Sequence, residues 1–151
     1  MSEYVKKRVS LLITLIFIST TNSAFSQSKY DLIKQVRFER GKSGTTITGV
    51  LIYGAKHFYR LKARKGQTMS VKVIAVDSKD QGDIAFTVQS RHYLPGRDTM
   101  ILDGIDPRGG NDEWSGDLPV TDEYEIVVHN PPVSDNPDSH PIRYKLEVTI
   151  K

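Results

Sequence analysis

The chain has 151 residues, no cysteine, 26% charged residues and a formal net charge of +3. Without cysteine there are no disulfide bonds and no thiol nucleophile, so a hydrophobic core alone must stabilise the fold. Three cations and one anion lie in the first 26 residues, which leaves 18 basic and 17 acidic residues in the remainder. A chain so close to neutrality is not expected to bind nucleic acid.

Residues 1–26 have the pattern of a secretory signal peptide. A basic start at residues 6–8 precedes the apolar run 9–18, and small polar residues continue as far as Ser26. An apolar run of about ten residues is too short to span a bilayer, which needs about twenty. We expect cleavage after Ser26, a single mature domain at 27–151 without stable membrane insertion, and a periplasmic or secreted location.

Apolar and polar residues alternate along most of the chain after residue 26, which predicts β-strands with one buried face. The last stretch is the clearest, because Ile142, Tyr144 and Leu146 alternate with charged residues. The predicted strands are 33–38, 45–52, 57–64, 68–76, 83–90, 98–103, 113–116, 123–129 and 142–150. Glycines and prolines separate them, and no sustained helical period occurs. The pattern predicts an all-β fold, an antiparallel β-sandwich of jelly-roll type with eight to nine strands.

Residues 59–76 are predicted to form a β-hairpin around the turn Lys65-Gly66-Gln67. Its solvent-facing side would carry a basic stripe of Arg60, Lys62, Arg64 and Lys72. If every connection changes ends of the sandwich, one end gathers the loops 53–56, 77–82, 104–112 and 130–141. Binding sites of sandwiches often lie on such loop clusters.

Charge is distributed unevenly along the chain. Residues 29–72 contain eleven cations and two anions, whereas residues 77–138 contain four cations and fourteen anions. The acidic loops of the second half are expected to attract a cationic protein partner.

Two catalytic or nucleotide-binding patterns are incomplete. Gly41-Lys42-Ser43 matches the end of a phosphate-binding loop, but Val36 occupies the position of its first glycine. The threonine-rich segment that follows favours a strand over the required helix. No Gly-x-Ser-x-Gly motif and no distinctive carboxylate pair occur, so we predict neither enzymatic activity nor a cofactor.

The remaining candidates are metal and sugar sites. The acidic loop 103–113 offers oxygen ligands of the kind calcium prefers, but its spacing differs from an EF-hand and a solvated turn explains it. We assign no metal there and leave calcium open. His57, His129 and His140 lack metal-ligand spacing and are interpreted as surface residues. Trp114 is interpreted as a core residue in preference to a sugar platform.

A series of motifs extends over residues 36–151. They are Phe38-x-x-Gly41-x-Ser43, Gly49, Tyr59-x-Leu61-x-Ala63-x-x-Gly66-Gln67, Phe86, Trp114-x-Gly116-x-Leu118-Pro119, Tyr124-x-Ile126-x-Val128 and Tyr144-x-Leu146-x-Val148. Their order resembles the bacterial pre-peptidase C-terminal-like jelly roll, and within that group the periplasmic inhibitors of g-type lysozyme. The resemblance implies a non-enzymatic protein that binds the active-site cleft of a lysozyme.

The same resemblance implies where the enzyme is contacted. In the family, an aromatic residue after the second strand and arginines in the last long loop make contacts. Here the aromatic position falls at Gly54, beside Tyr53, and residues 130–141 contain no arginine. We predict Tyr53 as the anchor, since buried aromatic side chains dominate interface energies. The full predicted partner-binding set is Tyr53, Gly54, Lys56, His57, Asp135, Asp138 and His140. The alternative is a carbohydrate- or peptidoglycan-binding envelope module that uses the basic stripe or Trp114.

Overall fold

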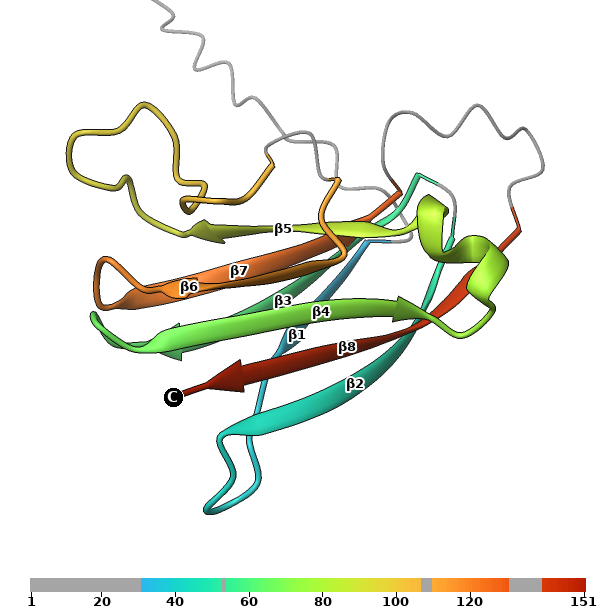
Figure 1. The fold of residues 1–151 in the computed structure, drawn as a ribbon, viewed down its shortest axis with the longest axis horizontal. Helices are drawn as coiled ribbons and strands as arrows, with labels where there is room; N and C mark the ends of the chain where they lie inside the picture. Colours follow the sequence, from blue (N-terminus) through green and yellow to red (C-terminus); the bar gives the residue numbers. More distant parts are fainter. Residues whose placement is uncertain (1–30, 53, 107–109, 131–139) are drawn as a thin grey trace, which may run out of the picture.

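A computed structural model describes residues 31–52, 54–106, 110–130 and 140–151. Within these ranges the chain forms a two-layer β-sandwich with one short 3-10 helix, η1 (Figure 1). The elements are β1 (Leu32–Gln35), β2 (Gly44–Leu51), β3 (Lys56–Ala63), β4 (Thr68–Ala75), η1 (Ser78–Asp83), β5 (Ala85–Ser90), β6 (Glu113–Asp117), β7 (Asp122–His129) and β8 (Ile142–Ile150). The predicted all-β sandwich of jelly-roll type is confirmed.

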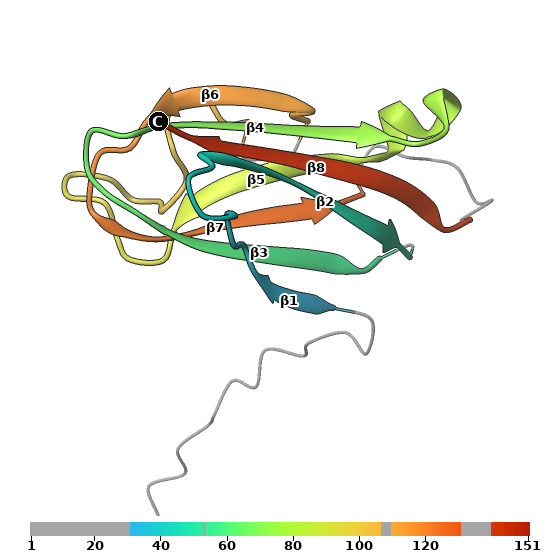
Figure 2. The same ribbon diagram turned by 90° about the horizontal axis from the view of Figure 1, so that it is seen from below.

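The strands alternate between the two sheets. One sheet has the order β1-β3-β7-β5 and the other the order β2-β8-β4-β6. The β1–β3 pair is parallel and the other described strand pairs are antiparallel. Because every connection crosses from one sheet to the other, no two consecutive strands of the described fold pair with each other. β1 and β2 are edge strands on the same side of the sandwich (Figure 2).

Two strand predictions are wrong. The predicted hairpin at 59–76 does not form, because β3 belongs to one sheet and β4 to the other. The predicted basic stripe is therefore divided, with Arg60 and Lys62 on one outer face and Lys72 on the opposite one. Residues 98–103 are not a strand. They lie along the edge of β5 and contribute a single bridge, between Ile101 and Gln89.

The core lies between the sheets and contains the inward-facing residues of each strand. In β8, Ile142, Tyr144 and Leu146 are buried while the charged residues between them are exposed, as the alternation predicts. Burying a large apolar side chain contributes about 1.5–3 kcal/mol. Gly49 is required here, because a Cβ at this position would lie 2.5 Å from the ring of Tyr144. Within the described ranges, no helix is long and apolar enough to cross a membrane.

Candidate functional site

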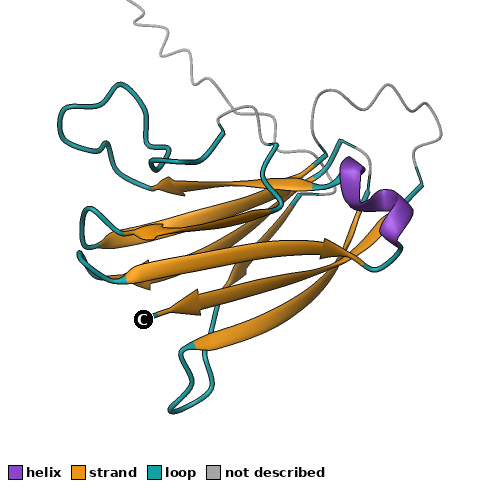
Figure 3. Ribbon diagram, in the orientation of Figure 1, coloured by secondary structure: helices purple, strands orange, loops and turns teal. Residues whose placement is uncertain are grey.

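Three connections meet at one end of the sandwich, which we call the loop end. Strand pairing brings the last residue of β2, Leu51, opposite Ile142 at the start of β8. It also places Lys56 at the start of β3 opposite His129 at the end of β7. The connections around 52–55 and 130–141 therefore leave the same end, as predicted. The connection that contains η1 joins them, on the right in Figure 1 and purple in Figure 3.

Three of the predicted partner-binding residues are exposed at the loop end: Gly54, Lys56 and His140. Gly54 has φ 75°, in a turn closed by a 2.9 Å hydrogen bond from the Ala55 N–H to the Ile52 carbonyl. The N–H of Lys56 donates to Asp31 Oδ1 at 2.9 Å, which fixes the start of β3. Three further predicted residues, Tyr53, Asp135 and Asp138, lie outside the described residues.

The prediction of His57 as a surface residue is wrong. Its position in β3 turns the side chain inward, and the residue is only 5% exposed. Nδ1 lies 2.6 Å from the hydroxyl of Tyr144, whose oxygen is also 2.6 Å from the Tyr59 hydroxyl. Burial lowers the pKa of His57, and the nearby charge of Asp31 opposes this effect. His57 thus belongs to the core next to the loop end, and its side chain is not available to contact a partner directly.

His140 forms one wall of a small polar cleft. Its Nε2 lies 3.0 Å from Oδ1 of Asp80, a buried residue of η1. This contact ties the start of β8 to η1. The cleft has a volume of about 130 Å³ and is lined by Asp77, Lys79, Asp80, His140, Pro141 and Arg143. The predicted partner-binding set contains neither Asp80 nor Arg143, because the sequence indicates Asp80 only as one of the acidic loop residues and Arg143 only as an outward-facing residue of the last strand.

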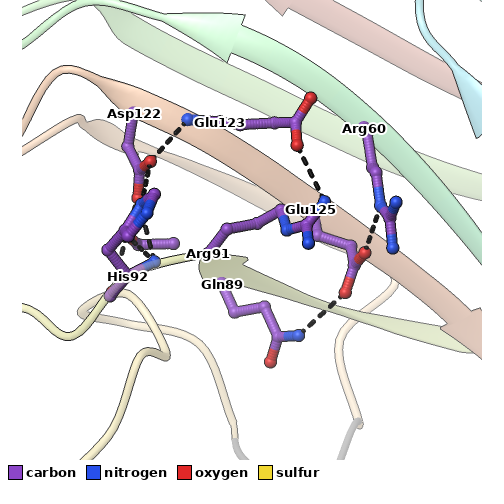
Figure 4. Close-up of polar contacts among 8 residues, drawn as sticks. Arg60, Gln89, Arg91, His92, Asp122, Glu123 and Glu125 are labelled. Carbon is purple, nitrogen blue, oxygen red and sulfur yellow. Dashed lines mark hydrogen bonds and ion pairs between the residues drawn. The ribbon is translucent and has the colours of Figure 1, made fainter.

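A second cluster lies at the opposite end of the sandwich, where β5 ends and β7 begins (Figure 4). It borders an open pocket of about 610 Å³ whose lining includes Lys62, Arg64, His92 and Asp122. Asp122 accepts hydrogen bonds from the Ser90 hydroxyl and, at 3.1 Å, from the His92 N–H. His92 Nδ1 lies 2.6 Å from its other oxygen. Burial opposes ionisation of Asp122, but the hydrogen bonds from Ser90, His92 and Glu123 lower its pKa.

This Ser90-Asp122-His92 cluster has the wrong order for nucleophilic catalysis. A catalytic triad places the imidazole between hydroxyl and carboxylate, so that it can take the serine proton. Here the carboxylate lies between the other two groups. The hydrogen bonds of this cluster instead join the end of β5 to the first residue of β7.

The acidic loop contains ion pairs. Arg97 is paired with Asp103, and Lys72 Nζ lies 2.8 Å from Glu113 Oε2. No group of three potential metal-binding side chains occurs in the part of the chain that the structure describes. Residues 107–109 of this loop lie outside the described ranges.

The same fold occurs in solved structures. Aeromonas hydrophila PliG, a periplasmic inhibitor of g-type lysozyme, is 26% identical, with a TM-score of 0.61 over 80% of this chain and 99% of that chain. Salmonella Typhimurium PliG is 21% identical, with a TM-score of 0.56 over 80% and 98%. The pre-peptidase C-terminal domain of a Bacillus anthracis collagenase is 14% identical, with a TM-score of 0.53 over 79% and 96%. Neither a scan of protein-family models nor a search of curated proteins gives a match.

These similarities define the class of fold. The chain is a jelly-roll sandwich of the kind shared by the PliG inhibitors and the pre-peptidase C-terminal domain. The resemblance seen in the sequence motifs is thereby confirmed, and within the group the PliG inhibitors match along almost their whole length.

Proposed function

We propose that the protein is a periplasmic inhibitor of lysozyme, of the class that acts on g-type enzymes, and that it is not itself an enzyme. The observation that carries the proposal is the match to Aeromonas hydrophila PliG, which covers 99% of that inhibitor. Inhibition would follow from occupation of the enzyme cleft by the loop end.

The described part of the loop end has the chemistry that such a cleft requires. Lysozymes cleave glycosidic bonds with carboxyl groups in the cleft. Lys56 and Arg143 are exposed cations at the loop end, and cations there would complement these carboxylates. Gly54 and His140 are the other exposed residues that we propose to contact the enzyme. We retain Tyr53, Asp135 and Asp138 as proposed contact residues, with Tyr53 as the anchor.

The proposal is tested by measuring inhibition constants against g-type, c-type and i-type lysozymes. We expect inhibition of a g-type enzyme, with Tyr53→Ala raising the inhibition constant by about 30-fold, equivalent to about 2 kcal/mol. Tyr93→Ala is the matched control, because Tyr93 is 75% exposed at the opposite end. An inhibition constant unchanged by Tyr53→Ala removes Tyr53 from the site, and absence of inhibition throughout the panel refutes the function.

The structure does not favour the alternative of a carbohydrate-binding module. Trp114 is 8% exposed, and its Nε1 donates to the Asp103 carbonyl at 3.0 Å, so its ring is not a platform for a sugar. The basic stripe is divided between two outer faces. Retention on insoluble peptidoglycan, without inhibition of any lysozyme, would reverse this preference.

We propose a periplasmic location, reached through cleavage of residues 1–26. β1 begins at Leu32, so cleavage after Ser26 leaves every described strand intact. The measurement is the intact mass of the exported protein, which should correspond to a chain that starts at Gln27. A mature protein that begins within β1 would contradict this boundary.

A further inference from the structure

Exposed apolar side chains are concentrated at the loop end. Among the described residues, six large hydrophobic side chains are exposed, and five of them surround this end. The sixth is Tyr93, at the opposite end. We call the five residues the apolar collar: Leu32, Ile33, Val50, Ile52 and Val76, which are 41–54% exposed.

Strand pairing places two collar residues in one row on the outer face of the β2-β8-β4-β6 sheet. Val50 in β2 is opposite Arg143 in β8. The N–H of Val76, one residue beyond β4, donates to the Arg143 carbonyl at 2.8 Å. Since neighbouring strands are about 4.8 Å apart, the two valines flank the exposed Arg143 over about 10 Å.

The other three collar residues belong to β1 or directly follow β2, and these two edge strands lie on the same side of the sandwich (Figure 2). Leu32 and Ile33 pair with His57 and Phe58, at the start of β3. Ile52 follows β2 and accepts the hydrogen bond that closes the turn at Gly54. The collar therefore adjoins the proposed contact residues directly.

On the outer face of the β2-β8-β4-β6 sheet, exposed large apolar side chains occur only near the loop end among the described residues. Farther along the same outer face, the exposed residues are polar or charged: Thr46, Thr48, Lys72, Lys145 and Glu147. Contiguous exposed apolar surface that is rimmed by polar groups marks an interaction site more often than random surface does. At the loop end of this face, Val50 and Val76 with the exposed Arg143 between them form a mixed apolar and cationic row, which is a candidate contact surface.

We propose that the apolar collar is the part of the inhibitor that packs against the rim of the lysozyme cleft while the loops enter it. This inference rests on the proposed function and extends the contact from the loop tips onto the sandwich body. A folded protein is the occupant that fits best, because the collar combines branched aliphatic side chains with the cations Arg143 and Lys56. A polysaccharide would instead require aromatic platforms and a dense set of hydroxyl partners.

The test uses isosteric substitutions that preserve strand preference. Val50→Thr combined with Val76→Thr replaces one methyl group by a hydroxyl at each position and leaves the outer sheet surface otherwise unchanged. We expect the double variant to weaken binding to the inhibited g-type lysozyme by about tenfold or more, mainly through faster dissociation. Tyr93→Thr is the control and should bind within about twofold of the unmodified protein. Denaturant unfolding of all variants verifies that the fold is retained.

The outcomes separate this inference from the proposed function. If the unmodified protein binds lysozyme and the double variant binds equally well, the collar is not part of the interface and the proposed function stands. If the unmodified protein binds no lysozyme, the proposed function fails and the assignment of the collar fails with it. If the unmodified protein is a dimer that the double variant converts to a monomer, the collar joins two copies of the chain and the lysozyme assignment is overturned.

Discussion

The hydroxyl of Tyr144 connects the two sheets across the core near the loop end. It comes from β8, and its two partners, His57 and Tyr59, come from β3 in the facing sheet. Burial raises the pKa of Tyr144 and of Tyr59, so both remain neutral and share a chain of hydrogen bonds. Gly49 leaves the space that the Tyr144 ring occupies. The motif residues Gly49, Tyr59 and Tyr144, which are far apart in the sequence, therefore meet in one contact.

Replacing Tyr144 by phenylalanine tests this contact. Tyr144→Phe keeps the ring but leaves the His57 and Tyr59 polar atoms without their partner, so we expect a loss of about 1–3 kcal/mol in the free energy of unfolding. Tyr124→Phe is the control, because its hydroxyl makes one hydrogen bond, to the Val120 carbonyl at 2.6 Å, and should cost about 1 kcal/mol. The measurement is urea denaturation at pH 7. Equal stability of Tyr144→Phe and the unmodified protein would show that the contact is not stabilising.

At the scale of the strands, one charged row crosses the outer face of the β1-β3-β7-β5 sheet. Arg60 Nε donates to Glu125 Oε2 at 2.7 Å, and Gln89 donates to the other oxygen at 3.0 Å (Figure 4). Glu125 is 7% exposed, which is unusual for a carboxylate on an outer face. A buried carboxylate needs such partners. Without them, its loss of hydration on folding is not compensated and the folded state is strongly destabilised.

Removal of Arg60 should therefore be costly. We expect Arg60→Met to destabilise the protein by about 1.5–3 kcal/mol, since Glu125 keeps only Gln89. Lys72→Met is the matched control. It breaks the Lys72–Glu113 pair, whose side chains are 46% and 66% exposed, and should cost much less than Arg60→Met because exposed ion pairs are weak. Thermal or urea unfolding of both variants gives the comparison, and equal losses would contradict the importance of burial.

Alternation in the sequence predicts strands but not their partners. The strand at 142–150 is predicted with its observed bounds, because each apolar residue of β8 faces the core. The alternation around Lys65-Gly66-Gln67 is equally regular, yet β3 and β4 do not pair, because a turn between strands looks the same whether or not the chain changes sheets. Alternation also fails at Met100-Ile101-Leu102, where apolar residues cover the edge of β5 without forming a strand.

The candidate site is less accessible to sequence reasoning than the fold. Gly54 and His140 lie in connections that share one end, and Lys56 is the first residue of β3 at that end, because the pattern of strands determines which connections share an end. His57 is in phase with the inward-facing Tyr59 and Leu61, so the alternation itself places it inside, and the surface interpretation follows from its polar side chain alone. Val50 and Val76 look like ordinary strand residues, since the sequence does not show which face is covered.

For the whole molecule, the uneven distribution of charge along the chain has a structural explanation. The basic strand β3 pairs with the acidic strand β7, so that Arg60 faces Glu125 and Lys62 faces Glu123. Lys72 of β4 likewise meets Glu113 of β6. Strand pairing therefore places some cations of the basic first half beside anions of the acidic second half. Part of the charge pattern thus serves strand pairing, which weakens the case for attraction of a cationic partner by the acidic segment as a whole.

The same interleaving determines how the chain must fold. No consecutive strands of the described ranges pair, and the β2–β8 ladder joins Leu51 to Ile142, about 90 residues later. Non-local pairing requires loop closure before contacts can stabilise it, so we expect refolding in milliseconds to seconds after dilution from denaturant, measured by stopped-flow fluorescence of Trp114. A chain that starts at Val36 and lacks β1 is the control. Because β1 is an exposed edge strand, its removal should accelerate unfolding and leave the refolding rate nearly unchanged. Refolding within microseconds, or a large decrease in refolding rate without β1, would contradict a transition state built on the long-range pairing of β8.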